Sequence, residues 1–378
     1  MYAAGAPDMK TLVIAPNWIG DALMAQPLLT LLKGVDSPQS DSQSGSLPGA
    51  QQIVALAPRW VAPVLDAMPE VDAVIATDLA HGALQWSARR ALAKQIAMQG
   101  FDRAFVLPNS FKSALIPWLA RIPQRIGYLG EGRYGLVNRR ADGPAASLAM
   151  SARYAALATV AGAALKTSLP AQLPAALPLP RLIVDDAAIA AVRARFGFAA
   201  DELIALCPGA EYGPAKRWPA DHFASLARSL IATRPNAHVL LLGGKGDRPI
   251  ADEIVAKATG AIALNRLHNL AGATDLAEAI ALIAASAQVV SNDSGLMHVA
   301  AALARPQVAI FGSSDPRHTP PLSARAKTLW LHLDCSPCFE RTCPLGHLNC
   351  LVGIAPQRVL DSMQNGSVLD STPPLPVR

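Results

Sequence analysis

The stretch Ala287-Gln288-Val289-Val290-Ser291-Asn292-Asp293-Ser294-Gly295-Leu296-Met297-His298 joins a short apolar run to the start of an alanine-rich helix. A turn of this kind directs free backbone N–H groups and the positive end of a helix dipole toward an anion. Asp293 adds an acceptor for a hydroxyl or amide, Gly295 lets a ligand approach the backbone, and His298 lies in the first helical turn. These residues favour a diphosphate site. The alternative is an N-capping box with a core histidine.

Short apolar runs alternate with helix-like stretches along the chain, in two series. The first series comprises residues 12–15, 53–56, 73–75 and 104–107, and the second comprises 203–206, 239–242, 289–290 and 308–311. Continuous apolar strands are typical of parallel sheets that are covered on both faces. The sequence therefore predicts an α/β protein with two Rossmann-like, doubly wound parallel-sheet domains that face each other across a cleft. Ligands are expected at the carboxyl ends of the strands.

The predicted domain boundary follows a proline-rich linker at residues 168–180. The N-terminal domain is expected over residues 1–180, with a flexible loop at 36–52 that is rich in serine, glutamine and glycine. The C-terminal domain is expected over residues 181–355 and includes a cysteine-rich segment at 335–350. A last helix is predicted at 356–364, because proline suits a first helical position, and a disordered tail is predicted at 365–378.

The composition is that of a globular protein, with 51% hydrophobic and 16% charged residues among 378. No uncharged apolar run approaches the ~18 residues that span a bilayer, and a cytoplasmic location is predicted. Ten basic residues lie between residues 81 and 140, against two acidic ones. They indicate either solvated helix faces or a site for an acidic substrate or an anionic membrane surface. Nucleic acid is disfavoured, since aromatic residues are few and do not alternate with the basic ones.

Four other strand ends carry polar residues. Asp21 follows the first strand, where it is either a general base or a charge stabilised by a helix dipole. Lys216, in the Gly- and Pro-rich loop 207–219, suits a diphosphate. Asp247 follows Gly243-Gly244-Lys245-Gly246 and is placed either to accept ribose hydroxyls or to cap a helix. That loop lacks the Walker and dinucleotide fingerprints, which weakens kinase, ATPase and dehydrogenase interpretations.

The fourth strand end is the loop 108–113, in which Ser110 is a candidate helix cap and Lys112 belongs to the basic region.

In order along nearly the whole chain, several segments resemble the ADP-heptose:lipopolysaccharide heptosyltransferase II family (glycosyltransferase family nine). They are residues 12–28, 107–115, 133–136, 207–219, 291–306 and 319–323. The resemblance implies the GT-B architecture. It also implies inverting transfer of L-glycero-D-manno-heptose from ADP-heptose to the first heptose of the lipopolysaccharide inner core, with no cofactor required for catalysis.

Two other activities stay open beside this one: heptosyltransferase I acting on a Kdo acceptor, and a GT-B sugar-nucleotide epimerase. The resemblance implies that Asp21 is the general base and that Lys216 counters the diphosphate charge during catalysis. It further implies donor binding by Lys216, Asp247, Asp293, Ser294, Gly295 and His298. Acceptor binding is implied for Asn109, Ser110, Lys112, Arg125 and Arg133. The implied partners are ADP-heptose and a lipid A-Kdo-heptose acceptor, with peripheral contact at the cytoplasmic face of the inner membrane.

Four of the five cysteines, Cys335, Cys338, Cys343 and Cys350, lie within one short segment. Clustered thiols in a cytoplasmic protein favour metal over disulfides, but the spacing is not that of a standard zinc ribbon. Structural zinc is thus one hypothesis, and reduced thiols or a reversible disulfide are the others. His347 is a candidate substitute ligand, whereas Cys207 is expected to be a small buried residue at a strand end.

Overall fold

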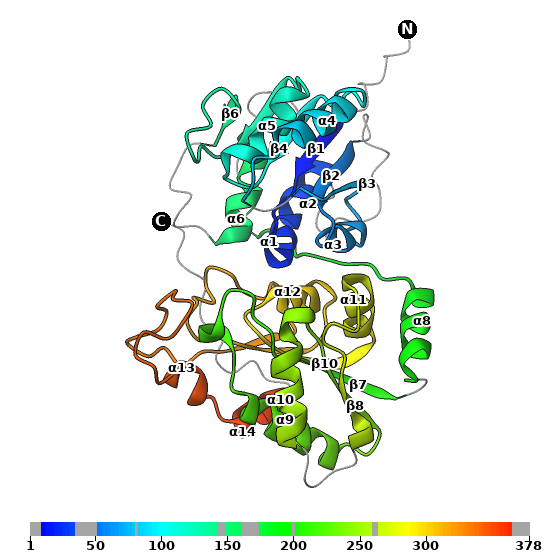
Figure 1. Cartoon of the computed structure of the whole chain (residues 1–378), viewed down its shortest axis with the longest axis vertical. Helices are drawn as coiled ribbons and strands as arrows, with labels where there is room; N and C mark the ends of the chain where they lie inside the picture. Colours follow the sequence, from blue (N-terminus) through cyan, green and yellow to red (C-terminus); the bar gives the residue numbers. More distant parts are fainter. Residues whose placement is uncertain are drawn as a thin grey trace. The chain divides into compact units, whose positions relative to one another are not determined.

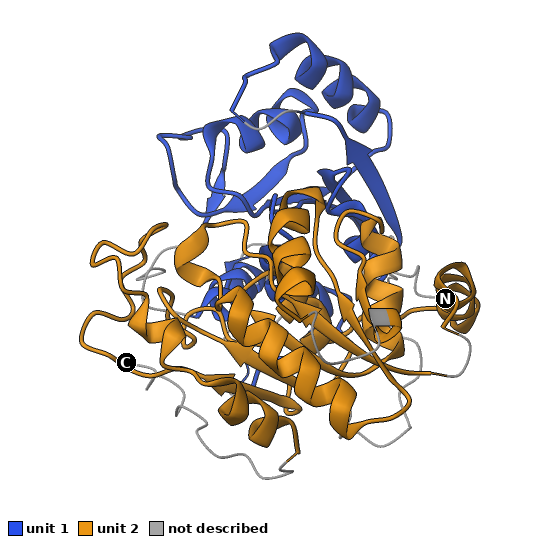
Figure 2. Cartoon of the chain, turned by 60° about the horizontal axis from the view of Figure 1, so that its bottom comes forward, with its two compact units in different colours: residues 1–180 blue, residues 181–378 orange. Residues whose placement is uncertain are grey.

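The computed structural model describes residues 9–34, 51–79, 82–141, 149–160, 174, 176–198, 201–258 and 264–364. The chain divides into two compact units, Met1–Pro180 and Arg181–Arg378, here called unit 1 and unit 2 (Figures 1 and 2). The loop 36–52 and the linker 168–180 lie mostly outside the described residues, and the tail 365–378 lies wholly outside them.

Unit 1 contains a six-stranded parallel sheet in the order β3-β2-β1-β4-β5-β6. Its strands are β1 (Lys10–Ile14), β2 (Gln52–Pro58), β3 (Ala73–Thr77), β4 (Arg103–Val106), β5 (Gln124–Gly127) and β6 (Arg139–Arg140). Its helices are α1 (Ile19–Met24), α2 (Gln26–Lys33), α3 (Ala62–Asp66), α4 (Trp86–Ala97), α5 (Phe111–Leu119) and α6 (Met150–Ala155). Leu12, Leu56 and Val106 pack with Ala93 of α4 and Leu115 of α5, so these two helices cover one face of the sheet.

Unit 2 repeats this plan with a sheet in the order β12-β11-β10-β7-β8-β9, again parallel throughout. Its strands are β7 (Glu202–Cys207), β8 (Ala237–Leu241), β9 (Leu267–Asn269), β10 (Ser286–Asn292), β11 (Gln307–Ile310) and β12 (Ala326–Leu329). Its helices are α8 (Asp186–Phe196), α9 (Ala220–Thr233), α10 (Arg248–Ala258), α11 (Leu276–Ala285), α12 (Gly295–Ala302), α13 (Asn349–Val352) and α14 (Pro356–Gln364). Short 3-10 turns lie at Pro214–Lys216, Lys245–Asp247 and Leu264–Arg266.

The two faces of the unit 2 sheet are covered by different helices, as the alternation of side chains along a strand requires. Val308 and Ile310 of β11 pack toward α9, α10 and α14, whereas Ala309 packs with Phe311 and with Met297 of α12. The prediction of two doubly wound parallel sheets is thereby confirmed. None of the described helices is long and apolar enough to cross a membrane.

The local sequence explains where several elements begin. Asp275 caps α11 by accepting the N–H of Glu278 at 2.8 Å, and the Glu278 carboxylate accepts the N–H of Asp275 at 3.0 Å. This reciprocal pair satisfies two backbone donors that a helix start leaves free. α8 ends at Phe196, and the next residue, Gly197, caps it with a φ of 77°, a left-handed conformation that glycine adopts without steric cost.

Candidate functional site

The carboxyl edge of the unit 1 sheet borders a cavity of about 500 Å³, here called the unit 1 cavity. Residues that follow β1, β2, β3 and β4 line it, together with residues of α6. This is the place where an open α/β sheet binds its ligands, because the loops after parallel strands meet at one edge. Its polar and aromatic lining includes Asn17, Trp18, Asp21, Trp60, Asn109, Ser110, Lys112, Glu131, Arg153 and Tyr154.

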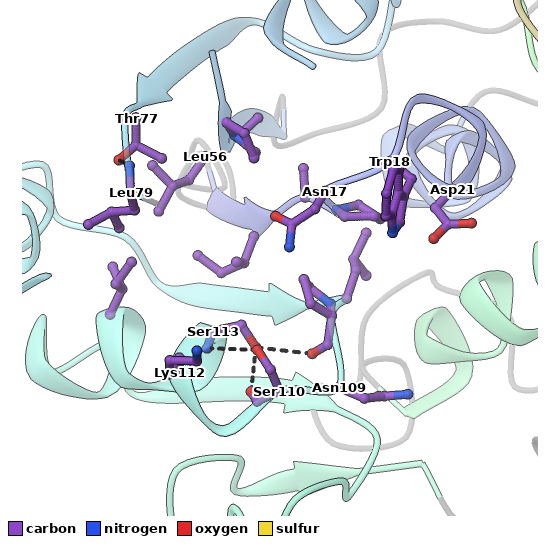
Figure 3. A pocket seen from close by; sticks show the side chains of 18 of the residues that line it. Asn17, Trp18, Asp21, Leu56, Thr77, Leu79, Asn109, Ser110, Lys112 and Ser113 are labelled. Carbon is purple, nitrogen blue, oxygen red and sulfur yellow. Dashed lines mark hydrogen bonds between the residues drawn. The ribbon is translucent and has the colours of Figure 1, made fainter. Parts of the chain in front are cut away.

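Asp21 lies in the first turn of α1 and faces the unit 1 cavity beside Trp18 (Figure 3). The exposed side chain of Trp60 donates its indole N–H to the carbonyl of Asn17 at 3.0 Å, which fixes one aromatic ring next to this turn. Burial raises the pKa of Tyr154, and the negative charge of Asp21 raises it further. The charge of Asp21 therefore acts on Tyr154, which lines the same cavity.

The loop after β4 forms the opposite side of the cavity (Figure 3). Ser110 caps α5, since its hydroxyl oxygen accepts the N–H of Ser113 at 3.3 Å. Glu131 accepts the N–H of Phe111 at 2.8 Å, and the ammonium of Lys112 donates to the carbonyl of Gly82. Asp21, Asn109, Ser110 and Lys112 thus all line the unit 1 cavity.

Arg133 and Arg125 have different positions from those that acceptor binding predicts. The side chain of Arg133 is fully buried, and its guanidinium donates to the carbonyls of Tyr128 and Pro108. Arg125 donates to the carbonyl of Leu136 at 2.7 Å and to two further carbonyls. Burial lowers the pKa of both groups, to about 10 for Arg133. Neither lines the cavity, so we correct their role to that of holding the loops behind it.

Arg89 and Arg153 are two cations that line this cavity and that the site prediction did not include. Arg153, on α6, lies over the ring of Tyr128 at 5.0 Å. It follows the basic region that ends at Arg140, and no pattern near it indicates a site. Only the packing of α6 against α1 and α2 brings it to the sheet edge.

In unit 2 the predicted donor residues gather at the carboxyl ends of β7, β8 and β10. The ammonium of Lys216 lies 2.6 Å from the carboxylate of Asp293, and the two side chains are 18% and 5% exposed. Ser314 donates its hydroxyl to the same carboxylate. A buried carboxylate with two donors is a stable partner that fixes the position of the lysine. The pair of serines at 313 and 314 directly follows a predicted strand, a signal that could have indicated Ser314.

Asn292 ties the loop that carries Lys216 to the end of β10. Its amide donates to the carbonyl of Pro208 at 2.7 Å, and its carbonyl oxygen accepts the N–H of Trp218 at 3.1 Å. Ser294 is the N-cap of α12 but makes no capping bond with its side chain. The capping box of the alternative interpretation is therefore wrong, whereas its buried histidine is present, since His298 is 6% exposed. The first N–H groups of α12, beginning at Gly295, receive no cap from the Ser294 side chain.

His298 and Asp247 complete the group. His298 is 6% exposed, and burial lowers its pKa to about 4, so the imidazole is neutral at pH 7. Asp247 accepts the N–H of Gly244 at 3.0 Å, so its capping role is present, and it lies 3.9 Å from the guanidinium of Arg217. Gly209 lies so close that a Cβ atom there would be 2.4 Å from the Asp247 carboxyl group.

The model for glycosyltransferase family 9 (heptosyltransferase) matches residues 89–349. The chain belongs to glycosyltransferase family 9. It is 43% identical to lipopolysaccharide heptosyltransferase 2 of Salmonella typhimurium over 365 residues, which cover 94% of this chain and 98% of that protein. The lipopolysaccharide heptosyltransferase 2 of Escherichia coli is 42% identical, with 94% and 97% covered.

The solved structure of E. coli ADP-heptose LPS heptosyltransferase II superimposes with a TM-score of 0.77 at 39% identity, and covers 94% of this chain and 97% of that one. The lipopolysaccharide heptosyltransferase 1 of Pseudomonas aeruginosa is 28% identical over 174 residues, which are 44% of each chain. The chain is therefore a glycosyltransferase, as predicted. Its identity to the two heptosyltransferase 2 proteins is higher, and extends over more residues, than its identity to the heptosyltransferase 1 of P. aeruginosa.

Proposed function

We propose that this heptosyltransferase moves L-glycero-D-manno-heptose from ADP-heptose to the first heptose of the lipopolysaccharide inner core. The observation that carries this assignment is the 43% identity, over nearly the full length of both chains, to a lipopolysaccharide heptosyltransferase 2. The site supports it independently. Unit 1 offers a roomy cavity with a carboxylate, whereas unit 2 offers a fixed lysine at a helix start, where an anion binds.

Asp21 is the proposed general base on the acceptor side. Its carboxylate takes the proton of the attacking heptose hydroxyl, whose oxygen then forms a bond to the anomeric carbon of the donor. The bond from that carbon to the β-phosphate oxygen breaks, the configuration inverts, and ADP leaves. No metal ion enters this sequence of steps.

Lys216 is the proposed counter-charge for the departing ADP. Negative charge grows on the β-phosphate as the bond breaks, and a cation already in place stabilises that charge without reorganisation. Asp293 and Ser314 hold the lysine, the start of α12 at Ser294 and Gly295 supplies N–H donors, and His298 is proposed to contact the sugar. Asp247 is proposed to accept the ribose hydroxyls.

The acceptor is proposed to lie in the unit 1 cavity, where Asn109 and Ser110 offer polar contacts to sugar hydroxyls. Lys112 and Arg153 are the cations placed for its acidic sugars and phosphates. Because the acceptor carries lipid A, we further propose that the protein works in the cytoplasm, in peripheral contact with the inner membrane.

The test supplies ADP-heptose to the purified chain together with one of two acceptors, a Kdo-only core or a core that already carries one heptose. Mass spectrometry of the glycolipid then reports the gain of one heptose. We expect extension of the monoheptosylated core only. Extension of the Kdo-only core alone would assign the chain to the first transfer, and turnover of ADP-heptose without any acceptor would indicate an epimerase.

A further inference from the structure

The cysteine-rich segment of unit 2 includes the start of α13 (Figure 1). Together with Ala215 and Ser313, this segment lines a small cavity. The cavity has a volume of about 20 Å³ and is lined by Cys335, Cys338, Cys343, Cys350 and His347. All four cysteines are free thiols. A space of this size accommodates about one atom-sized occupant, such as a water or an ion. Four cysteines that line one such space supply the ligand types of a tetrahedral metal site.

Cys343 begins a tight turn whose residues also line the cavity. The N–H of Gly346 donates to the carbonyl of Cys343 at 3.2 Å, and Gly346 has a φ of 73°, a left-handed conformation that glycine adopts without steric cost. A cysteine binds a metal in its thiolate form.

Cys350 lies in α13 and also lines the cavity. It is 8% exposed within the main core of unit 2, so the packing around it holds this residue in place. Cysteines bind a metal after they lose their protons, and a divalent ion then neutralises the charge of the thiolates that it brings together.

The same segment is bonded to the loop that carries Lys216. The hydroxyl of Tyr212 donates to the carbonyl of Phe339 at 2.6 Å, and the N–H of Ala215 donates to the carbonyl of Arg341 at 3.0 Å. The ammonium of Lys216 lies 5.1 Å from the centre of the Tyr212 ring. Whatever fixes the cysteine segment therefore also fixes the loop around Lys216.

We propose that Cys335, Cys338, Cys343 and Cys350 bind one zinc ion as four thiolates, and that this ion holds the Lys216 loop in place. Within the described part of the chain, no three potential ligands are close enough to share an ion as their side chains stand. Binding thus requires the cysteines to rotate about their Cα–Cβ bonds, among staggered rotamers, until the sulfurs converge. His347 is not a ligand in this site, because its Nδ1 already accepts the N–H of Asn349 at 3.0 Å.

The first experiment measures metal content in the full-length chain, purified anaerobically without added metal or a histidine tag. We expect about one zinc per chain, lost from the Cys338→Ser/Cys343→Ser variant and retained by the matched His347→Asn variant. In the wild-type chain, replacement of zinc by cobalt should give the intense visible bands of a tetrahedral thiolate complex. A zinc content near zero, iron in place of zinc, or a disulfide within the segment would overturn the site.

The second experiment tests the link to Lys216 and rests on the proposed donor role of unit 2, whereas the metal content does not. Chelation of the wild-type protein should weaken ADP binding about tenfold, by calorimetry, with recovery when Zn²⁺ is added back. Circular dichroism checks that the fold survives chelation. Unchanged ADP affinity in a folded, zinc-free protein would overturn the link to the loop, even if the four-thiolate site itself is present.

Discussion

The two units have the same sheet architecture, but the polar residues at the carboxyl edges of their sheets are arranged differently. At the carboxyl edge of the unit 1 sheet, Asp21, Asn109 and Lys112 line a cavity of about 500 Å³. At the same edge of unit 2, Lys216 and Asp293 are paired at 2.6 Å, with Asp293 almost completely buried. Unit 2 is preorganised around a fixed charge, which suits the small anionic donor proposed for it. Unit 1 leaves space, which suits the bulky glycolipid acceptor proposed for its cavity.

Replacement of Asp21 by asparagine tests the unit 1 side of this comparison most strongly. Loss of the proposed general base should lower kcat by about 10²–10⁴-fold, while ADP affinity stays unchanged because the proposed donor residues lie in unit 2. Steady-state kinetics and calorimetry measure the two quantities. Asp78→Asn is the matched control, since it removes an exposed carboxylate of unit 1 that pairs with exposed Arg59. A normal rate of ADP release from Asp21→Asn, with acceptor present, would remove Asp21 from its role.

Replacement of Lys216 by methionine tests the unit 2 side. The variant leaves the Asp293 charge buried without its ammonium partner, which should cost about 3 kcal/mol of unfolding free energy. It should also lower kcat by about 10²–10³-fold, because no cation meets the departing diphosphate. Adding Asp293→Asn should restore most of the stability but none of the rate.

Urea unfolding and kcat separate these two effects of Lys216. Lys257→Met is the control, since its pairs with Asp221 and Glu253 are solvent-exposed and contribute little. Full activity in the double variant would show that Lys216 serves only to neutralise Asp293. The fixed charge at the carboxyl edge of the unit 2 sheet would then have no role in catalysis.

The central strands of both units could be predicted from sequence because they are buried on both faces. The continuous apolar runs at residues 12–15 and 203–206 lie in β1 and β7, in the middle of each sheet. The strands that the apolar runs missed, β5, β6, β9 and β12, lie toward the sheet edges. They are short and carry polar residues such as Arg125 and Lys327, so no apolar run marks them.

The sequence could predict only those residues of the candidate site that directly follow a strand. Asp21, Lys216 and Asp293 follow apolar runs, and parallel strands bring such positions to one edge. The direction of each basic side chain is a tertiary property, and here the sequence was misleading. Arg133 is directed into a shell of carbonyls, whereas Arg153 reaches the cavity from a helix with no local signal.

Acid should destabilise unit 2 through His298. The pKa of His298 is about 4 in the folded chain, against an ordinary value of 6.5, because burial disfavours the charged imidazole. Between these pH values the unfolded chain binds a proton that the folded chain does not, so stability falls as pH decreases through this window. The loss amounts to about 3 kcal/mol when complete.

Urea midpoints between pH 7 and pH 4 measure the contribution of His298. The pH dependence should flatten in His298→Gln and persist in His347→Gln, which removes an exposed histidine of the same unit. If the urea midpoint of His298→Gln depended on pH as steeply as that of the wild-type chain, other groups would cause the acid sensitivity, and not the buried histidine at the edge of the unit 2 sheet.

Two glycine replacements give the smallest effects but the sharpest division between the units. In Gly209→Ala the new Cβ would lie 2.4 Å from the Asp247 carboxyl group, which must move from its bond to Gly244. We expect ADP affinity to fall about tenfold, the loss of one well-made hydrogen bond to a charged group, while the acceptor KM stays constant. Gly246→Ala is the control, because its Cβ meets nothing within 4 Å.

In unit 1 the equivalent replacement is Gly130→Ala, whose Cβ would lie 2.7 Å from the backbone oxygen of Asn109. It should displace Asn109 at the rim of the cavity and raise the acceptor KM several-fold, with ADP affinity unchanged. The two variants are thus expected to have opposite effects, since each disturbs one residue at the edge of one sheet and leaves the other sheet edge intact. Gly209→Ala should change only ADP affinity, and Gly130→Ala should change only the acceptor KM. If both variants changed the same constant, donor and acceptor would not bind to separate units. The difference between the open cavity of unit 1 and the buried Lys216–Asp293 pair of unit 2 would then need another explanation.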